Sequence, residues 1–362
     1  MRRWGGPGLL LIVLVIVGCT ADPGAQTAPT PAATTANTGT TSAPPPAPSP
    51  SPTVSPTPTA KPTAKAKPKP KPHPISVQAL IEKKYDGRAL KLGRQIGAAN
   101  SYKRYLITYR GDGERISGVM NVPDGKGPFP VLVLNHGYID PRTYFPGQGM
   151  AREHDYLARR GFVVLHIDYR GHATSTNDKN VDYELRLPYA VDAINAVKAV
   201  ESSKLKFLDG DRVGMLGRSM GGGVTLTALA AQPGLVDAAV IYASVSSLAA
   251  DNWKQFSSDA EDQATNRRIA RTYGLPDESP KFWRAASARP YLDRVTEPIM
   301  VHHGLQDDTC PIDWSRATVR ALRAADKDVT YLSYRGEGHR FEGQWQRSIE
   351  RTADFFDREL RG

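Results

Sequence analysis

The stretch DRVGMLGRSMGGGVTLTALAA, residues 211–231, decides the fold of this chain. It opens with an apolar run that is typical of a buried strand and closes with a run that is typical of a helix. Between them, the letters GRSMG at 217–221 match the pattern G-x-S-x-G, in which a serine occupies a sharp turn between a strand and a helix. Small residues must flank such a serine because the turn is tight, and Gly217 and Gly221 meet that need. The sequence therefore predicts that Ser219 is a nucleophile held on a strained turn.

Apolar runs on both sides of this stretch predict further strands, separated by helices. Strands are expected at 129–137, 161–171, 236–244, 297–304 and 328–334, with helices at 147–160, 181–202 (long and amphipathic), 312–325 and 344–361. Residues 103–109 and 115–122 alternate in polarity and predict an antiparallel pair joined by 111–113. Strands alternating with helices indicate an α/β protein with a mostly parallel sheet and helices on both faces.

A polar insertion around 245–290 interrupts this alternation and carries several aromatic residues. They are Trp253, Phe256, Tyr273, Phe282 and Trp283. We expect a helical, lid-like segment, whose aromatic residues either line a substrate pocket or pack the insertion onto the domain.

A serine hydroxyl becomes an effective nucleophile when a histidine takes its proton and a carboxylate orients that histidine. His339 follows the last predicted strand, where the G-x-S-x-G fold places this base. The acid is expected just after the preceding strand, where Asp307 and Asp308 are both available and the pattern does not separate them. His302 and His303 lie nearby, but a lone pair of histidines is no metal signature, and we expect neither a metal nor a cofactor.

The oxyanion that forms during such a reaction needs two N–H donors. The backbone N–H of Met220, directly after the nucleophile, is the first candidate. The second is the backbone N–H of Tyr138, in the loop after the strand at 129–137. His136 in the same loop is expected to be structural, not a second base.

Four stretches together resemble the catalytic domain of the prolyl oligopeptidase family of serine peptidases and of their esterase relatives. They are LNHGY (134–138), GRSMGGG (217–223), SARPYLDRVTEPIMVHHGLQDDTCP (287–311) and GEGH (336–339). The resemblance implies an α/β-hydrolase fold and makes Asp307 the catalytic acid, with Cys310 at a position where valine is usual. We expect Cys310 to be a buried structural residue.

The same resemblance implies a serine hydrolase that cleaves peptide or ester bonds through an acyl-enzyme. No β-propeller and no Glu-Glu motif are seen in the sequence, so a carboxylesterase or lipase-like activity is the alternative to a peptidase. A binding module that has lost catalysis is a further alternative, since fold does not fix function.

The first 74 residues indicate export. Residues 1–19 combine Arg2 and Arg3 with a short apolar run, and they end at Cys19 in a stretch that resembles a bacterial lipobox. Residues 20–74, rich in Pro, Thr, Ala and Lys, are expected to form a disordered tether, followed by a catalytic domain at 75–362. We therefore expect a lipoprotein anchored through Cys19 to the bacterial membrane, outside the cytoplasm. Much of the net charge of +10 lies in this segment, so nucleic-acid binding is not expected.

Overall fold

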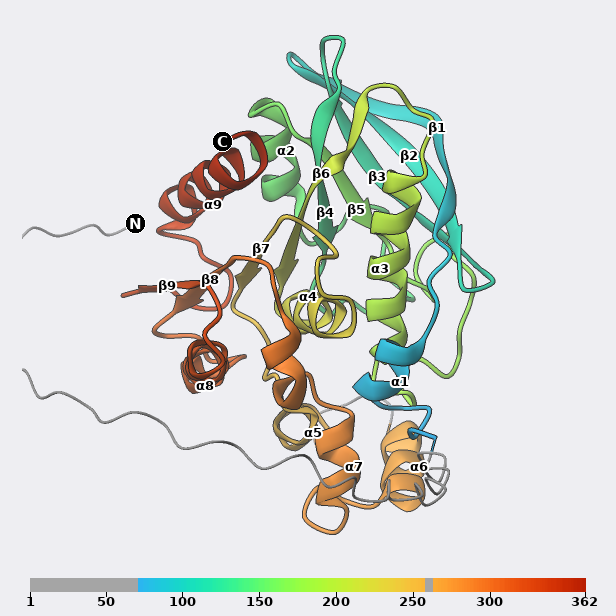
Figure 1. Cartoon of the computed structure of the whole chain (residues 1–362), viewed down its shortest axis with the longest axis vertical. Coiled ribbons are helices and arrows are strands. Elements are labelled where there is room, and N and C mark those ends of the chain that lie inside the picture. Colours follow the sequence, from blue (N-terminus) through green and yellow to red (C-terminus); the bar gives the residue numbers. More distant parts are fainter. Residues whose placement is uncertain (1–70, 258–262) are drawn as a thin grey trace, which may run out of the picture. The chain divides into compact units, whose positions relative to one another are not determined.

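A computed structural model of the chain describes residues 71–257 and 263–362. Within them, one sheet has the strand order β1-β2-β3-β5-β4-β6-β7-β8-β9 (Figure 1). The strands are β1 (Arg88–Ala99), β2 (Tyr102–Gly111), β3 (Glu114–Pro123), β4 (Phe129–Asn135), β5 (Val163–Ile167), β6 (Leu208–Arg218), β7 (Ala238–Tyr242), β8 (Ile299–Gly304) and β9 (Val329–Tyr334). The pairs β1·β2, β2·β3 and β3·β5 are antiparallel, and the other pairs are parallel.

Helices connect the parallel strands and cover both faces of the sheet. They are α1 (Val77–Glu82), α2 (Ala151–Arg159), α3 (Leu187–Glu201), α4 (Met220–Ala231), α5 (Ala249–Phe256), α6 (Gln263–Tyr273), α7 (Pro280–Ala285), the 3-10 helix η1 (Arg289–Arg294), α8 (Ile312–Ala324) and α9 (Trp345–Arg361). Helices α3, α4 and α8 contribute to the apolar core on one face, and α2 and α9 to the core on the other. This arrangement confirms the predicted α/β-hydrolase fold.

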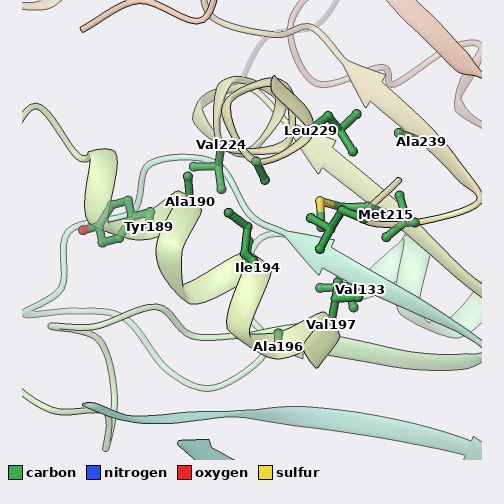
Figure 2. Packing of buried hydrophobic residues seen from close by; sticks show 14 of the residues in the cluster. Val133, Tyr189, Ala190, Ile194, Ala196, Val197, Met215, Val224, Leu229 and Ala239 are labelled. Atoms are coloured by element: carbon green, nitrogen blue, oxygen red, sulfur yellow. The ribbon is translucent and has the colours of Figure 1, made fainter. Parts of the chain in front are cut away.

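The two cores follow from the alternation of side chains along each strand. In β4, Val133 belongs to the core under α3 and α4, whereas its neighbour Leu132 belongs to the core under α2 and α9. Figure 2 shows Ile194 of α3 close to Val133 and to Met215 of β6. Burying each such side chain stabilises the fold by about 1.5–3 kcal/mol. The end of β6, where Ser219 follows, is therefore fixed by packing on both faces.

Strand β1 was not predicted, because its sequence lacks a clear apolar pattern. Most of its residues are exposed, and only Leu90 is buried. It pairs with β2 alone at the edge of the sheet, with irregular register between Leu92 and Gln95. A polar edge strand carries little hydrophobic periodicity, which explains the omission.

The predicted amphipathic helix at 181–202 is wrong in two respects. Helix α3 begins at Leu187, because Leu185 and Arg186 both have left-handed backbones with φ of 53° and 59°. Thirteen of its fifteen residues are buried, so the helix has no polar face. The helix lies between α4 and the strands of the sheet, including β1.

The hairpin prediction is confirmed: β2 and β3 pair from Gly111 and Glu114, around the two-residue turn at 112–113.

The insertion is helical, as predicted, and forms α5, α6 and α7. Figure 1 shows these helices together at one end of the domain, near α1. Ile269, Tyr273 and Trp283 form a small apolar cluster of their own. The ring of His73 contacts the same cluster edge-on, 5.1 Å from Phe282.

The predicted segment 1–19, its Cys19, and most of the predicted tether lie outside the described residues. Among the helices of 71–257 and 263–362, none is long and apolar enough to cross a bilayer.

Candidate active site

Ser219 lies at the sharp turn between β6 and α4, as predicted. Its backbone has φ 56° and ψ −121°, a positive-φ conformation that costs about 1–3 kcal/mol for a residue with a side chain. The turn is held by hydrogen bonds: the Ser219 N–H donates to the Tyr242 carbonyl at 2.9 Å, and the Ser219 carbonyl accepts from Gly222 N–H at 2.9 Å and from Val245 N–H at 3.2 Å. The surrounding backbone therefore maintains the strained conformation.

Gly217 and Gly221 leave no room for a side chain. A Cβ on Gly221 would overlap with the carbonyl oxygen of Asn135, and one on Gly217 would overlap with the carbonyl oxygen of Gly221. The elbow thus packs directly against the end of β4, which brings the loop after β4 beside Ser219.

His339 and Asp307 meet in the loops that follow β9 and β8. Asp307 Oδ2 lies 2.9 Å from His339 Nδ1, and Oδ1 lies 3.1 Å from it. Asp308 instead is exposed and accepts a hydrogen bond from the Thr309 hydroxyl at 3.2 Å. Of the two carboxylates that the residue pattern did not separate, the structure brings to the histidine Asp307, the one that the family resemblance implied.

The Asp307 carboxylate is buried and fully hydrogen-bonded. Burial by itself raises the pKa of Asp307, but hydrogen bonds from His303, His339 and the Cys310 N–H outweigh it and hold the pKa well below its usual range. Because the carboxylate only accepts, Nδ1 of His339 must carry the proton. Nε2 of the neutral ring is then left with a lone pair and can act as a base.

Cys310 is buried, as predicted. Burial and the nearby charge of Asp307 raise the pKa of its thiol to about 12, so the thiol stays protonated. Its backbone N–H donates to Asp307 Oδ1 at 2.8 Å, and its thiol lies within hydrogen-bonding reach of the Ser219 side chain. Cys310 is thus a structural neighbour of the predicted triad and not a second nucleophile.

The two predicted oxyanion donors lie on segments that flank Ser219. Met220 is the first residue of α4, where N–H groups lack partners within the helix. The loop after β4 passes so close that a Cβ on Gly137 would lie 3.2 Å from Ser219 Cβ. Tyr138 follows in this loop; the residue is 57% exposed, and the Arg186 guanidinium lies 4.5 Å from the centre of its ring.

Three other histidines near the site, His136, His302 and His303, are fully buried. His136 is buried and stacks on Tyr144 at 4.8 Å, and burial lowers its pKa to about 3, so its ring is neutral. His302 and His303 point to opposite faces of the sheet, as neighbours in a strand must. His302 contacts the Tyr334 hydroxyl, whereas His303 contacts Ser315 of α8. In the part of the chain that the structure describes, no cluster of metal-binding side chains occurs.

Arg218 is a functional neighbour that the sequence reasoning missed. Its guanidinium donates to the backbone carbonyls of His339 at 3.3 Å and Arg340 at 3.2 Å, and to the Glu153 carboxylate of α2 at 3.0 Å. Glu153 also accepts from the Trp345 indole N–H at 3.2 Å. The hydrogen bonds to the carbonyls tie the elbow to the loop that carries His339, and the buried ion pair ties it to α2. The only sequence signal was a charged residue inside GRSMG, next to a nucleophile.

Ser219 and His339 open into a cavity of about 1370 Å³. Tyr138 lines it on one side, and Trp253 and Phe256 of α5 line it from the insertion. Other aromatic residues of the insertion pack among themselves, as Tyr273 and Phe282 stack at 4.4 Å. Some aromatic residues of the insertion therefore line the cavity, whereas others pack within the insertion.

Comparisons with known proteins show which family and fold the chain resembles. The model of the prolyl oligopeptidase family matches residues 149–362. The dipeptidyl aminopeptidase BIII of Pseudoxanthomonas mexicana is 27% identical over 234 residues, which cover 60% of this chain and 31% of that protein. Esterase LipC of Mycobacterium tuberculosis is 30% identical over 233 residues, which cover 59% of this chain and 54% of that protein. This chain thus spans about a third of the length of the first relative and about half of the second.

The fold has solved counterparts as well. Acetyl Xylan Esterase 1 from Thermoanaerobacterium sp. JW/SL YS485 has a TM-score of 0.59 at 19% identity, and the likeness covers 80% of this chain and 95% of that one. At this identity the likeness concerns the fold alone. Because the family model covers more than half of the sequence, the chain belongs to the prolyl oligopeptidase family.

Proposed function

We propose that this serine hydrolase cleaves peptide or ester bonds through an acyl-enzyme on Ser219, with His339 as the base and Asp307 as the carboxylate that orients His339. The observation that carries the proposal is the 2.9 Å contact between His339 Nδ1 and the buried Asp307 carboxylate, in the same site as the strained Ser219. A strained serine and an oriented histidine in one cavity are what nucleophilic catalysis requires.

In the first half-reaction, Nε2 of His339 takes the hydroxyl proton while Ser219 Oγ attacks the substrate carbonyl carbon. The carbonyl oxygen becomes an oxyanion that accepts from the N–H groups of Met220 and Tyr138. The imidazolium then gives its proton to the leaving amine or alcohol, and the acyl-enzyme remains. In the second half, His339 activates a water that attacks the ester, and Ser219 is released with its proton restored.

Asp307 has two roles in these steps. It fixes the tautomer of His339, and its negative charge stabilises the imidazolium that forms in each half-reaction. The low pKa of this carboxyl keeps the charge in place across the working range of a histidine base. Both half-reactions use only side chains and backbone N–H groups of the chain, together with one water molecule.

Peptides are the first substrate class to test, because the relative from Pseudoxanthomonas mexicana is a dipeptidyl aminopeptidase. Carboxylic esters are the second class, supported by the 30% identity to Esterase LipC. Both classes pass through the same intermediate, so the triad does not distinguish them. The cavity walls from Tyr138, Trp253 and Phe256 would then select the acyl group.

The test measures kcat/KM of the purified protein on p-nitrophenyl esters of increasing acyl length and on aminoacyl and dipeptidyl p-nitroanilides. Ser219→Ala is assayed beside the wild type. We expect turnover that is lost in the variant, and anilide turnover identifies a peptidase whereas ester turnover alone identifies an esterase. Equal turnover by the variant contradicts the mechanism, and a wild type that turns over neither class favours a non-catalytic binding module.

We also propose that the protein is exported and anchored to the bacterial membrane by lipid on Cys19. The support is the order of features in the sequence: two arginines, an apolar run, Gly18-Cys19 and a long Pro/Thr/Ala-rich segment. More than one acyl chain gives stable anchoring. Metabolic labelling with a palmitate analogue is expected to mark the wild type and not Cys19→Ser, and labelling of both contradicts the proposal.

A further inference from the structure

His303 contacts Asp307, the same carboxylate that contacts His339. His303 lies in β8 and is fully buried. Its Nε2 lies 3.3 Å from Asp307 Oδ2 and 2.8 Å from the Cys310 carbonyl oxygen. Both neighbours only accept hydrogen bonds, so Nε2 carries a proton, which it donates to the Cys310 carbonyl oxygen, with Asp307 Oδ2 as a second, longer contact.

The other ring nitrogen of His303 is also engaged. Ser315, buried in α8, places its Oγ 2.6 Å from Nδ1. In the neutral ring, Nδ1 has a lone pair and accepts the Ser315 hydroxyl proton. The charged and polar groups that face His303 are therefore Asp307, Cys310 and Ser315, and His302 faces the opposite side of the sheet.

The Asp307 carboxylate is thereby held on both oxygens. Oδ1 accepts from the N–H groups of Thr309 at 3.0 Å and Cys310 at 2.8 Å. Oδ2 is shared between His303 and His339. Among the described residues, Oδ2 without His303 would keep only its contact with His339, whose ring gains and loses a proton during turnover.

We propose that His303, held by Ser315, is a positioning residue that keeps Asp307 aligned with His339 during turnover. This inference rests on the proposed hydrolytic function. His303 does not line the cavity, so its role is exerted through Asp307 and not through substrate contact.

The test replaces His303 by two amides of different length. The amide nitrogen of His303→Gln can occupy the place of Nε2 and donate to Asp307, whereas that of His303→Asn is too short and reaches the place of Nδ1. Titration with a fluorophosphonate counts competent sites, so kcat per site excludes losses through misfolding. Against p-nitrophenyl esters or anilides, we expect His303→Gln to keep kcat per site within about threefold of wild type.

His303→Asn is expected to lower kcat per site by about 10- to 100-fold with KM unchanged, because misplacement of a catalytic group by about 1 Å costs up to about 100-fold. A purely structural role predicts fewer titratable sites with normal kcat per site. That result, or His303→Gln as slow as His303→Asn, overturns the proposal.

Ser315→Ala supplies a second test, which does not depend on how well the asparagine variant folds. Glutamine has no atom at the place of Nδ1, so the Ser315 hydroxyl matters only when the imidazole is present. We expect Ser315→Ala to lower kcat per site in the wild type and to have no effect in His303→Gln, a non-additivity that reports direct coupling. Equal effects in both backgrounds overturn the positioning role. Loss of the proposed function itself appears separately, as wild-type turnover that Ser219→Ala retains.

Discussion

Replacement of His154 by leucine removes a buried imidazole that has no hydrogen-bond partner among the described residues. His154 lies in α2, fully buried, with its ring 4.7 Å from that of His166. Burial lowers its pKa to about 3, helped by the nearby charge of Arg104. Leucine has a similar volume and no ionisable group, so the change deletes one titration without breaking a hydrogen bond.

The magnitude follows from linkage between protonation and folding. The folded state keeps His154 neutral down to about pH 3, whereas the unfolded chain takes up the proton near pH 6.5. The unfolded state thus binds more protons between these values, and stability falls as pH drops through 6.5. Each pH unit costs about 1.4 kcal/mol, which gives about 2 kcal/mol at pH 5.0 and almost nothing at pH 7.5.

The assay is urea unfolding, followed by circular dichroism, of wild type and His154→Leu at pH 7.5 and pH 5.0. The free-energy difference between variant and wild type is expected to shift by about 2 kcal/mol in favour of the variant at pH 5.0. His302→Leu is the matched control, because burial lowers the pKa of His302 to about 3 as well, but its ring contacts the hydroxyls of Tyr334 and Thr352. For His302→Leu, the free-energy difference from wild type should shift by the same amount between pH 7.5 and pH 5.0, but this variant should be less stable than wild type at pH 7.5. A His154→Leu difference that is equal at both pH values would refute the reasoning.

Two further predictions concern the acid and the ion pair beside the elbow. Asp307→Asn is expected to lower kcat/KM by about three to four orders of magnitude because the histidine loses its proper tautomer, while Asp308→Asn stays within about fivefold in steady-state assays. A larger loss for Asp308→Asn than for Asp307→Asn would identify Asp308 as the catalytic carboxylate instead. Arg218→Met leaves the Glu153 carboxylate buried without its positively charged partner and should cost about 3–5 kcal/mol in urea unfolding. The double variant Arg218→Met/Glu153→Leu is expected to recover most of that loss, and a single variant as stable as wild type would contradict this account.

Local patterns predicted the parts of the fold that depend on neighbours in sequence. The elbow at 217–221 joins a strand, a turn and a helix within one short stretch of sequence. Gly217 and Gly221 are the small residues that the motif calls for, and the structure has no room for a side chain at either position. The central strands are buried on both faces, so their apolar runs were clear. The edge strand β1 and the start of α3 at Leu187 were not predicted, because a polar edge strand and a left-handed turn leave no periodic pattern in the sequence.

The parts of the site that could not be predicted from local sequence patterns depend on contacts between residues far apart in the chain. Composition and spacing do not separate Asp307 from Asp308; the family resemblance implied Asp307, and the path of the loop after β8 brings it to His339, 32 residues further along. The pair Arg218–Glu153 joins residues 65 apart, and His303 reaches Asp307 through the side of the strand that it faces. Such choices depend on tertiary geometry, which no single motif contains.

The central claim is that Ser219 is the nucleophile of this site. The most direct measurement is peptide mapping by mass spectrometry after reaction with a fluorophosphonate, which forms a covalent bond to an activated serine. The account predicts one adduct per chain, on Ser219, and none on Ser219→Ala. An adduct on another residue, or equal labelling of the alanine variant, would contradict it.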